Sequence, residues 1–151
     1  EKEDDSRGVA FWGNSGKLLT QMIQSIGVNR EAVYITNIIK CRPPGDREPQ
    51  GDEITTCLPI LDKQIEILKP KLIVSLGQKS LETLVSRNIN LKQVRGKYFK
   101  YKEIPLLATY HPNDIAKQRK LASEVWVDFR RVRQFMFNLN QNPSKSYPPK
   151  Q

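Results

Sequence analysis

The sequence predicts an α/β fold, a three-layer α/β/α sandwich in which helices cover both faces of a short parallel sheet. Two observations support this prediction. Short runs of apolar, β-type residues alternate along the chain with longer segments whose apolar residues recur at helical spacing. One of the runs, Leu72–Leu76 (LIVSL), has the composition of a buried strand in a parallel sheet.

The first half of the chain contains two predicted helices with a predicted strand between them. Ser15 can cap a helix that Gly27 ends. Val33–Thr36 is predicted to be a strand, and a loop with three prolines follows at Cys41–Gln50. Asp52 or Glu53 opens the next helix, which Pro70 ends. The predicted buried faces of the two helices comprise Leu18, Leu19, Met22, Ile23 and Ile26, then Ile54, Leu58, Leu61, Ile65 and Leu68.

The second half begins with the strand Leu72–Leu76 and continues through Gly77 into a helix over Lys79–Ser86. Arg95–Tyr101 is predicted to be a small excursion or hairpin, and Pro105–Tyr110 another strand. From residue 113 to 139 the pattern is helical, in one piece or two. The residues of this segment available for burial are Leu121, Val125, Val127, Phe129, Val132, Phe135 and Phe137.

Only three sheet strands are evident, which is few for such a domain. Residues 1–13 have the character of a loop, so we expect the first strand of the sheet to be missing from this chain. The length of 151 residues predicts one domain, which we place at 1–138. Residues 139–151 are polar and proline-rich, and we expect a flexible C-terminal tail there.

The net charge of +9 favours a polyanionic partner, although a lysine-rich solubilising surface would give the same charge. No apolar run approaches the roughly 20 residues that a membrane-spanning helix needs, so we expect no membrane partner. The acidic start, EKEDDSRG, does not have the character of a signal peptide. Two cysteines do not make a secreted disulfide framework, and we expect a reducing, intracellular location.

Two polar side chains follow predicted strands. Asn37 comes directly after Val33–Thr36, and His111, the only histidine, comes directly after Pro105–Tyr110. Ligands bind at the carboxyl ends of strands in open α/β sheets, so an amide and an imidazole placed there suggest a pocket for a nucleobase. The alternatives are that Asn37 only caps its loop and that His111 is a structural loop residue.

Several further segments form an ordered set along the chain. They are Gly8–Gly16 (GVAFWGNSG), Lys17–Leu19 (KLL), Tyr34–Pro44 with Arg47, Glu53–Leu61 with Gln64, Pro70–Gly77 (PKLIVSLG), Arg95–Gly96, Thr109–Pro112 (TYHP), and Trp126 with Asp128. Taken together, these segments resemble the family 4 uracil-DNA glycosylases, the iron–sulfur type. The similarity departs from the family pattern in lacking a glycine-rich GExPG segment and an upstream cysteine pair, and in having Ala10, Trp12 and Asn113 at motif positions.

The resemblance implies a DNA-repair hydrolase of base excision repair that flips uracil out of the duplex and cleaves its N-glycosidic bond. Phe11 would stack on the uracil, Asn37 would hydrogen-bond its edge, and His111 would stabilise the negative charge on the leaving uracil. Asp4 would assist the water or the sugar cation. Alternatively, Phe11 is a core residue and Asp4 a solvated surface acid.

The resemblance also implies that Cys41 and Cys57 are two of four thiolate ligands of a [4Fe–4S] cluster, although this chain has no other cysteine. Alternatively, both are inert buried thiols. DNA contacts are expected at the turn after Gly77 and in the segment after His111, with an ordinary strand–helix turn and a solvated helix face as the alternatives. The residues concerned are Gln78, Lys79, Ser80, Asn113, Lys117, Arg119 and Lys120.

The functional hypothesis is therefore a uracil-DNA glycosylase acting on uracil-containing DNA, cytoplasmic or nucleoid-associated. We expect a monomer unless a partner supplies the missing strand. The alternative is a catalytically inactive relative that binds DNA or a protein partner through the same surface.

Overall fold

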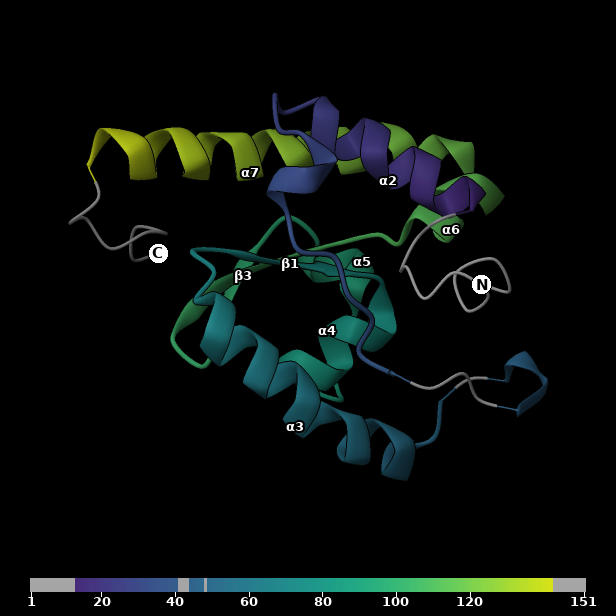
Figure 1. The fold of residues 1–151 in the computed structure, drawn as a ribbon. Coiled ribbons are helices and arrows are strands. Elements are labelled where there is room, and N and C mark those ends of the chain that lie inside the picture. Colours follow the sequence, from purple (N-terminus) through teal and green to yellow (C-terminus); the bar gives the residue numbers. More distant parts are fainter. Residues whose placement is uncertain (1–12, 41–43, 48, 143–151) are drawn as a thin grey trace.

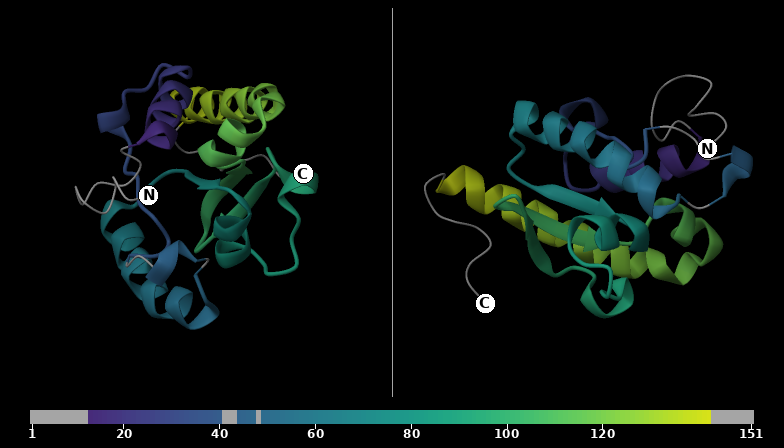
Figure 2. Two further views of the ribbon diagram at one scale, coloured as in Figure 1. Left: turned by 90° about the vertical axis from the view of Figure 1, so that its right-hand side faces the viewer. Right: turned by 90° about the horizontal axis from the view of Figure 1, so that it is seen from below.

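The computed structural model describes residues 13–40, 44–47 and 49–142, and it confirms the three-layer arrangement. A three-stranded sheet lies between two layers of helices, with α2, α6 and α7 on one face and α3 and α4 on the other (Figures 1 and 2). The helices are α2 (Asn14–Gln24), α3 (Gly51–Leu68), α4 (Gln78–Leu84), α5 (Leu91–Val94), α6 (Pro112–Lys117) and α7 (Ala122–Gln141).

The sheet has the strand order β1-β3-β2, from β1 (Ile73–Leu76), β2 (Tyr98–Tyr101) and β3 (Ile104–Thr109). β1 runs parallel to β3, and β2 pairs with β3 in antiparallel fashion, so the hairpin expected at Arg95–Tyr101 makes the sheet mixed instead of wholly parallel. β3 is central, and its residues 106–109 are fully buried. Within the described residues β1 has a partner on one side only, so this strand, whose composition is that of a buried parallel strand, is at an edge.

The predicted strand Val33–Thr36 is wrong. A 3-10 turn (Arg30–Ala32) comes before it, and residues 33–36 are in no ladder among the described strands. β-type residues form a strand only where another strand offers hydrogen-bonding partners. Side chains hold the segment instead: Gln64 Nε2 of α3 donates to the Tyr34 hydroxyl at 2.9 Å.

The predicted helices form, with different ends. α2 begins at Asn14 with Gly13 as its N-cap, so the predicted cap residue Ser15 lies buried in the first turn. At the start of α3 the Glu53 carboxylate accepts the backbone N–H of Gln50 at 2.8 Å, which satisfies a donor of the helix terminus. The long C-terminal helical segment is in two main pieces, α6 and α7, joined by a 3-10 turn at Arg119–Leu121.

Three side chains predicted to be buried are exposed instead: Leu68 on α3, and Val127 and Phe137 on α7. Their neighbours Ile65, Phe129 and Phe135 fill the faces toward the sheet. The main core joins α2, α7, α4 and β3, with Leu19, Met22, Leu81, Ala108, Val125 and Phe129 at its centre. Of the helices that the structure describes, none combines the length and apolarity needed to cross a membrane.

Candidate functional site

His111 lies directly beyond β3 and forms the N-cap of α6. Its backbone is extended, Pro112 occupies the first helical position, and the His111 N–H donates to Asp114 Oδ2 at 3.2 Å. The Asn113 N–H donates to His111 Nδ1 at 3.1 Å. Nδ1 is therefore an acceptor without a proton, so the neutral imidazole carries its hydrogen on Nε2. The cap thus sets the tautomer, in which Nε2–H is the donor of the ring.

The turn after β1 packs directly against His111. The Gly77 N–H donates to the carbonyl of Thr109 at 2.8 Å, and Gly77 has φ +87° and ψ 167°. A Cβ at Gly77 would lie 3.1 Å from His111 Cβ. The structure therefore brings two of the predicted regions, the turn after Gly77 and His111, to one end of the sheet.

The three residues predicted to contact DNA after Gly77 differ in their surroundings. The Gln78 side chain accepts the Leu91 N–H at 2.8 Å, and the Ser80 hydroxyl donates to the Leu76 carbonyl at 2.8 Å. These bonds stiffen the strand–helix turn. An ordinary turn of this kind is the alternative to DNA contact that the sequence left open for Gln78 and Ser80. Lys79, the only charged residue of the three, is exposed, and its ammonium lies 3.7 Å from a Glu82 carboxylate oxygen.

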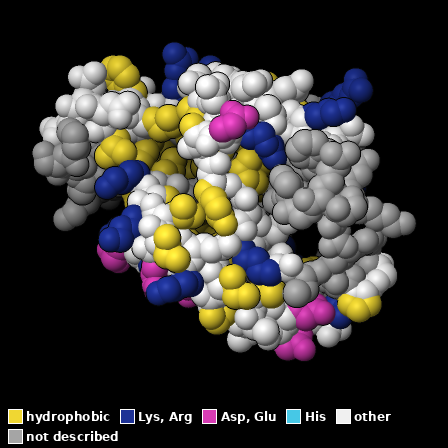
Figure 3. All heavy atoms as spheres, in the orientation of Figure 1, with side chains coloured by type: hydrophobic (Ala, Val, Ile, Leu, Met, Phe, Trp, Pro, Cys, Tyr) yellow, Lys and Arg dark blue, Asp and Glu magenta, His cyan; other side chains and the backbone are white. Residues whose placement is uncertain are grey.

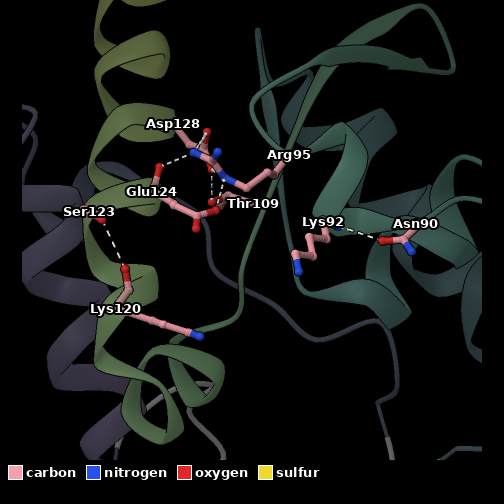
Figure 4. Close-up of polar contacts among 8 residues, drawn as sticks. All are labelled: Asn90, Lys92, Arg95, Thr109, Lys120, Ser123, Glu124 and Asp128. Atoms are coloured by element: carbon pink, nitrogen blue, oxygen red, sulfur yellow. Dashed lines mark hydrogen bonds and ion pairs between the residues drawn. The ribbon is translucent and has the colours of Figure 1, made fainter.

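The cations predicted downstream of His111 are all exposed: Lys117 on α6, and Arg119 and Lys120 on the turn that follows. In Figure 4 the Lys120 ammonium points into the space between this turn and α5, and Lys92 of α5 extends toward the same space. Lys92 was not among the predicted residues, because nothing in its local sequence distinguishes it from other surface lysines. Asn113, also predicted, contributes its backbone N–H to the His111 ring.

Asn37 is exposed on the irregular segment before the proline-containing loop. Lys40 holds this segment against α3, because its ammonium donates to the Asn37 carbonyl and the Thr36 hydroxyl, both at 2.7 Å, and to Gln64 Oε1 at 2.8 Å. Burial lowers the pKa of Lys40, and the nearby Cys57 opposes this effect. Asn37 is thus anchored through α3, while His111 is anchored through β1 and α6.

Three of the predicted site residues, Asp4, Phe11 and Cys41, lie outside the described residues. Cys57 is buried on α3, and its sulfur accepts the Lys40 backbone N–H at 3.4 Å. Across the described ranges, no three or more His, Cys, Asp or Glu side chains are grouped to hold a metal ion. The two cysteines of this chain therefore do not fit a four-thiolate cluster by themselves.

A buried polar cluster that sequence reasoning did not assign to the site lies beside β3. Asp128 of α7 is 1% exposed, and its carboxylate accepts three hydrogen bonds (Figure 4). They come from Arg95 Nη2 at 2.8 Å, from Arg95 Nε at 3.1 Å and from the Thr109 hydroxyl at 2.6 Å. Burial raises the pKa of Asp128, and the bonds from Thr109 and Arg95 oppose that rise. A signal was present in the sequence, because Asp128 is an acid on the same helical face as the buried Val125 and Phe129.

A family model described as "Uracil DNA glycosylase superfamily" matches residues 1–130. The chain is 43% identical over 142 residues to the Type-4 uracil-DNA glycosylase of Sulfurisphaera tokodaii, an alignment that covers 88% of this chain and 64% of that protein. It is 35% identical to the Type-4 uracil-DNA glycosylase of Archaeoglobus fulgidus (87% and 70%) and 36% identical to that of Thermotoga maritima (89% and 72%). The chain thus spans about two thirds of the length of these relatives.

Proposed function

The chain belongs to the uracil-DNA glycosylase superfamily and to its Type-4 group, and from this we propose that it excises uracil from DNA by hydrolysing the N-glycosidic bond. The observation that carries the proposal is the environment of His111. Its Nδ1 accepts the Asn113 N–H, so Nε2–H is the ring's donor, at the end of the sheet where ligands of α/β folds bind.

The reaction needs electrostatic help more than a nucleophile. Negative charge grows on the departing uracil while the sugar acquires cationic character, as in glycoside hydrolysis. A donor facing the uracil oxygen stabilises that charge, and one such oriented donor contributes about 3 kcal/mol, roughly a hundredfold in rate. We assign this role to His111 Nε2–H. Asn37 would bind the uracil edge, Phe11 would stack on the ring, and Asp4 would assist the water or the sugar cation.

The DNA strand would be held by its phosphates. The exposed cations Lys117, Arg119 and Lys120 follow His111 in sequence. Lys79 follows Gly77, and the turn at Gly77 packs against His111. The net charge of +9 supports a polyanionic substrate. For Gln78 and Ser80 the contact would use backbone groups, because hydrogen bonds within the protein engage their side chains. For Asn113 it would use the side-chain amide, because the Asn113 N–H donates to the His111 ring.

A [4Fe–4S] cluster on this protein would use Cys41 and Cys57 and would need two further thiolates. The hydrogen bond from the Lys40 N–H to Cys57 Sγ is of the kind that tunes the sulfur ligands of such clusters. The cluster's part would be structural, and no catalytic step is assigned to it. Iron content and absorbance near 400 nm of anaerobically purified protein would test this assignment.

Among the described strands β1 has a neighbour on one side only, and a partner strand would add on the other side. Figure 3 shows apolar side chains gathered on the face between α3 and the layer of α2 and α7, which is the face crossed by the segment carrying Tyr34. Tyr34 is 58% exposed and Leu68 is 46% exposed. We propose a monomer, located with the DNA in the cytoplasm or nucleoid, unless a strand from a partner pairs with this edge. Sedimentation analysis of the purified chain would distinguish the two states.

The test of function is the release of free uracil from a uracil-containing oligonucleotide. We expect Asn37→Ala to abolish the release and His111→Ala to reduce it about a hundredfold. Asn88→Ala, which removes another exposed asparagine amide, is the matched control and should leave the rate unchanged. A folded wild-type protein that binds DNA with a steep salt dependence but releases no uracil would refute the enzymatic proposal and support the inactive alternative.

A further inference from the structure

We propose that Asp128 is a positioning residue for His111. Together with Arg95 and Thr109, its carboxylate fixes the carboxyl end of β3 and thereby the orientation in which His111 presents Nε2–H. The inference rests on the proposed function only for the substrate on which His111 acts. The orientation of the His111 ring is a property of the folded chain and does not depend on that function.

The first step of the argument is the completeness of the cluster. A fully buried carboxylate is stable only if charged and hydrogen-bonding partners replace the water it has lost. Arg95 gives Asp128 two N–H bonds, at 2.8 and 3.1 Å, and Thr109 adds a hydroxyl at 2.6 Å. Arg95 also bonds the Glu124 carbonyl and lies 3.4 Å from a Glu124 carboxylate oxygen, so two turns of α7 share one guanidinium.

The second step is the close approach of backbone to this carboxylate. Gly96 has φ +71°, and a Cβ there would collide with Asp128 Oδ1. Its N–H donates to the Ala108 carbonyl at 2.7 Å, and its own carbonyl accepts Arg131 Nη1 at 2.7 Å. The chain entering β2 is therefore clamped between β3 and α7 at the level of Asp128.

The third step connects the cluster to the imidazole. Thr109 is fully buried and is held on two sides, by Asp128 through its hydroxyl and by the Gly77 N–H through its carbonyl. His111 is two residues further along and packs against Gly77. A loss of the Asp128 bond would therefore release the side-chain anchor of the strand end that carries His111. Displacements of about 1 Å at a reacting group cost on the order of a hundredfold in rate.

If the role of Asp128 is purely structural, its replacement lowers the stability of the fold but leaves the orientation of the His111 ring unchanged. The chain offers a matched control for a loss of stability alone. Asp62 of α3 accepts the Tyr101 hydroxyl at 2.5 Å and Lys102 Nζ at 2.9 Å. It fastens a helix to the hairpin turn before β3, at the opposite end of that strand from His111. Asp62→Asn therefore removes a carboxylate that joins a helix to the sheet without touching the strand end that leads to His111.

The experiment uses the fact that His111 is the only histidine, so its ring gives a single set of nitrogen and proton resonances. Wild type, Asp128→Asn and Asp62→Asn are compared by two-bond ¹H–¹⁵N correlation spectra of the ring and by unfolding curves. We expect the His111 signals to move in Asp128→Asn and to stay at wild-type positions in Asp62→Asn. In single-turnover excision of uracil, Asp128→Asn should lose about tenfold to a hundredfold in rate with KM within about twofold.

A milder pair of variants decides the question if Asp128→Asn does not fold. Thr109→Val removes the hydroxyl that reaches Asp128 and keeps the side-chain shape, and Thr109→Ser restores the hydroxyl. Displaced His111 signals in Thr109→Val that return in Thr109→Ser would support the proposal. Wild-type His111 signals in both folded Asp128→Asn and Thr109→Val, or an equal displacement in Asp62→Asn, would overturn it. If the wild type releases no uracil, the proposed function fails while the spectra still test the positioning.

Discussion

Replacing Gly77 by alanine tests whether the β1 turn sets the place of the His111 ring. Gly77 has φ +87° and ψ 167°, a backbone region that is essentially restricted to glycine and that costs other residues about 1–3 kcal/mol. The added methyl group would lie 3.1 Å from His111 Cβ, so the ring must move by a few tenths of an ångström. Crowding of this kind adds about 1 kcal/mol. We therefore expect Gly77→Ala to lower the free energy of unfolding by about 2–4 kcal/mol.

The matched control is Gly27→Ala at the end of α2. Gly27 also has a positive φ, +79°, but a Cβ there would meet no atom within 4 Å. The control therefore carries a backbone cost of roughly 1–2 kcal/mol without a neighbour to push. Urea unfolding gives the stability difference, and the nitrogen resonances of the single histidine report its position.

We expect Gly77→Ala to shift the His111 resonances and to slow uracil excision about tenfold, on the scale at which small misplacements lower rates. Gly27→Ala should change neither. The reasoning is refuted if Gly77→Ala costs no more stability than Gly27→Ala while its His111 spectrum and excision rate remain those of the wild type.

Three further predictions concern the surface of the molecule. The hydrogen bond from Arg47 lowers the pKa of Glu53 to about 2, so this pair stabilises the fold above pH 4.5 and loses its effect as the pH falls toward 2. The melting temperature of Glu53→Gln should therefore fall less on acidification than that of the wild type, and an equal fall would contradict the pairing. Lys120→Ala should weaken binding to single-stranded oligonucleotide and reduce its log–log salt slope by about 0.7, whereas an unchanged slope would remove Lys120 from the DNA surface. Tyr101→Phe should cost about 1 kcal/mol in urea unfolding, because it removes the bond to Asp62, and a neutral result would show that the bond contributes nothing.

The parts of the fold that local sequence determines were predictable. The apolar spacing in α2 and α3 and the apolar runs at β1 and β3 gave these elements within a few residues, because periodicity and composition are properties of a short segment. Residues 33–36 were predicted wrongly, because a strand depends on a neighbour that the segment itself does not specify. Phe137 was predicted to be buried and is exposed for a similar reason. The spacing of apolar residues marks the apolar face of a helix, but it does not specify how much of that face other elements cover.

The site was predictable only in part. Where His111 lies, after a buried strand, follows from the sequence, but the hydrogen bond that sets its tautomer depends on the geometry of the α6 cap. The Arg95–Asp128 pair joins residues 33 positions apart, and no local pattern specifies such a partner. The roles of Asp4, Phe11 and Asn37 remain predictions, and the Asn37→Ala variant tests the last of them.

In the part of the chain that the structure describes, β1 has no strand partner on one side, and this edge affects how the protein behaves in concentrated solution. A strand edge with open N–H and C=O groups is a template on which a second molecule can add. Tyr34 and Leu68 are exposed apolar side chains that could add contacts between molecules. Electrostatic repulsion between molecules of charge +9 opposes this aggregation at low salt. At 0.1 M salt the repulsion is screened beyond about 10 Å, so conditions that release the nucleic acid also favour clustering of the protein. Light scattering recorded alongside each salt titration would separate the two processes.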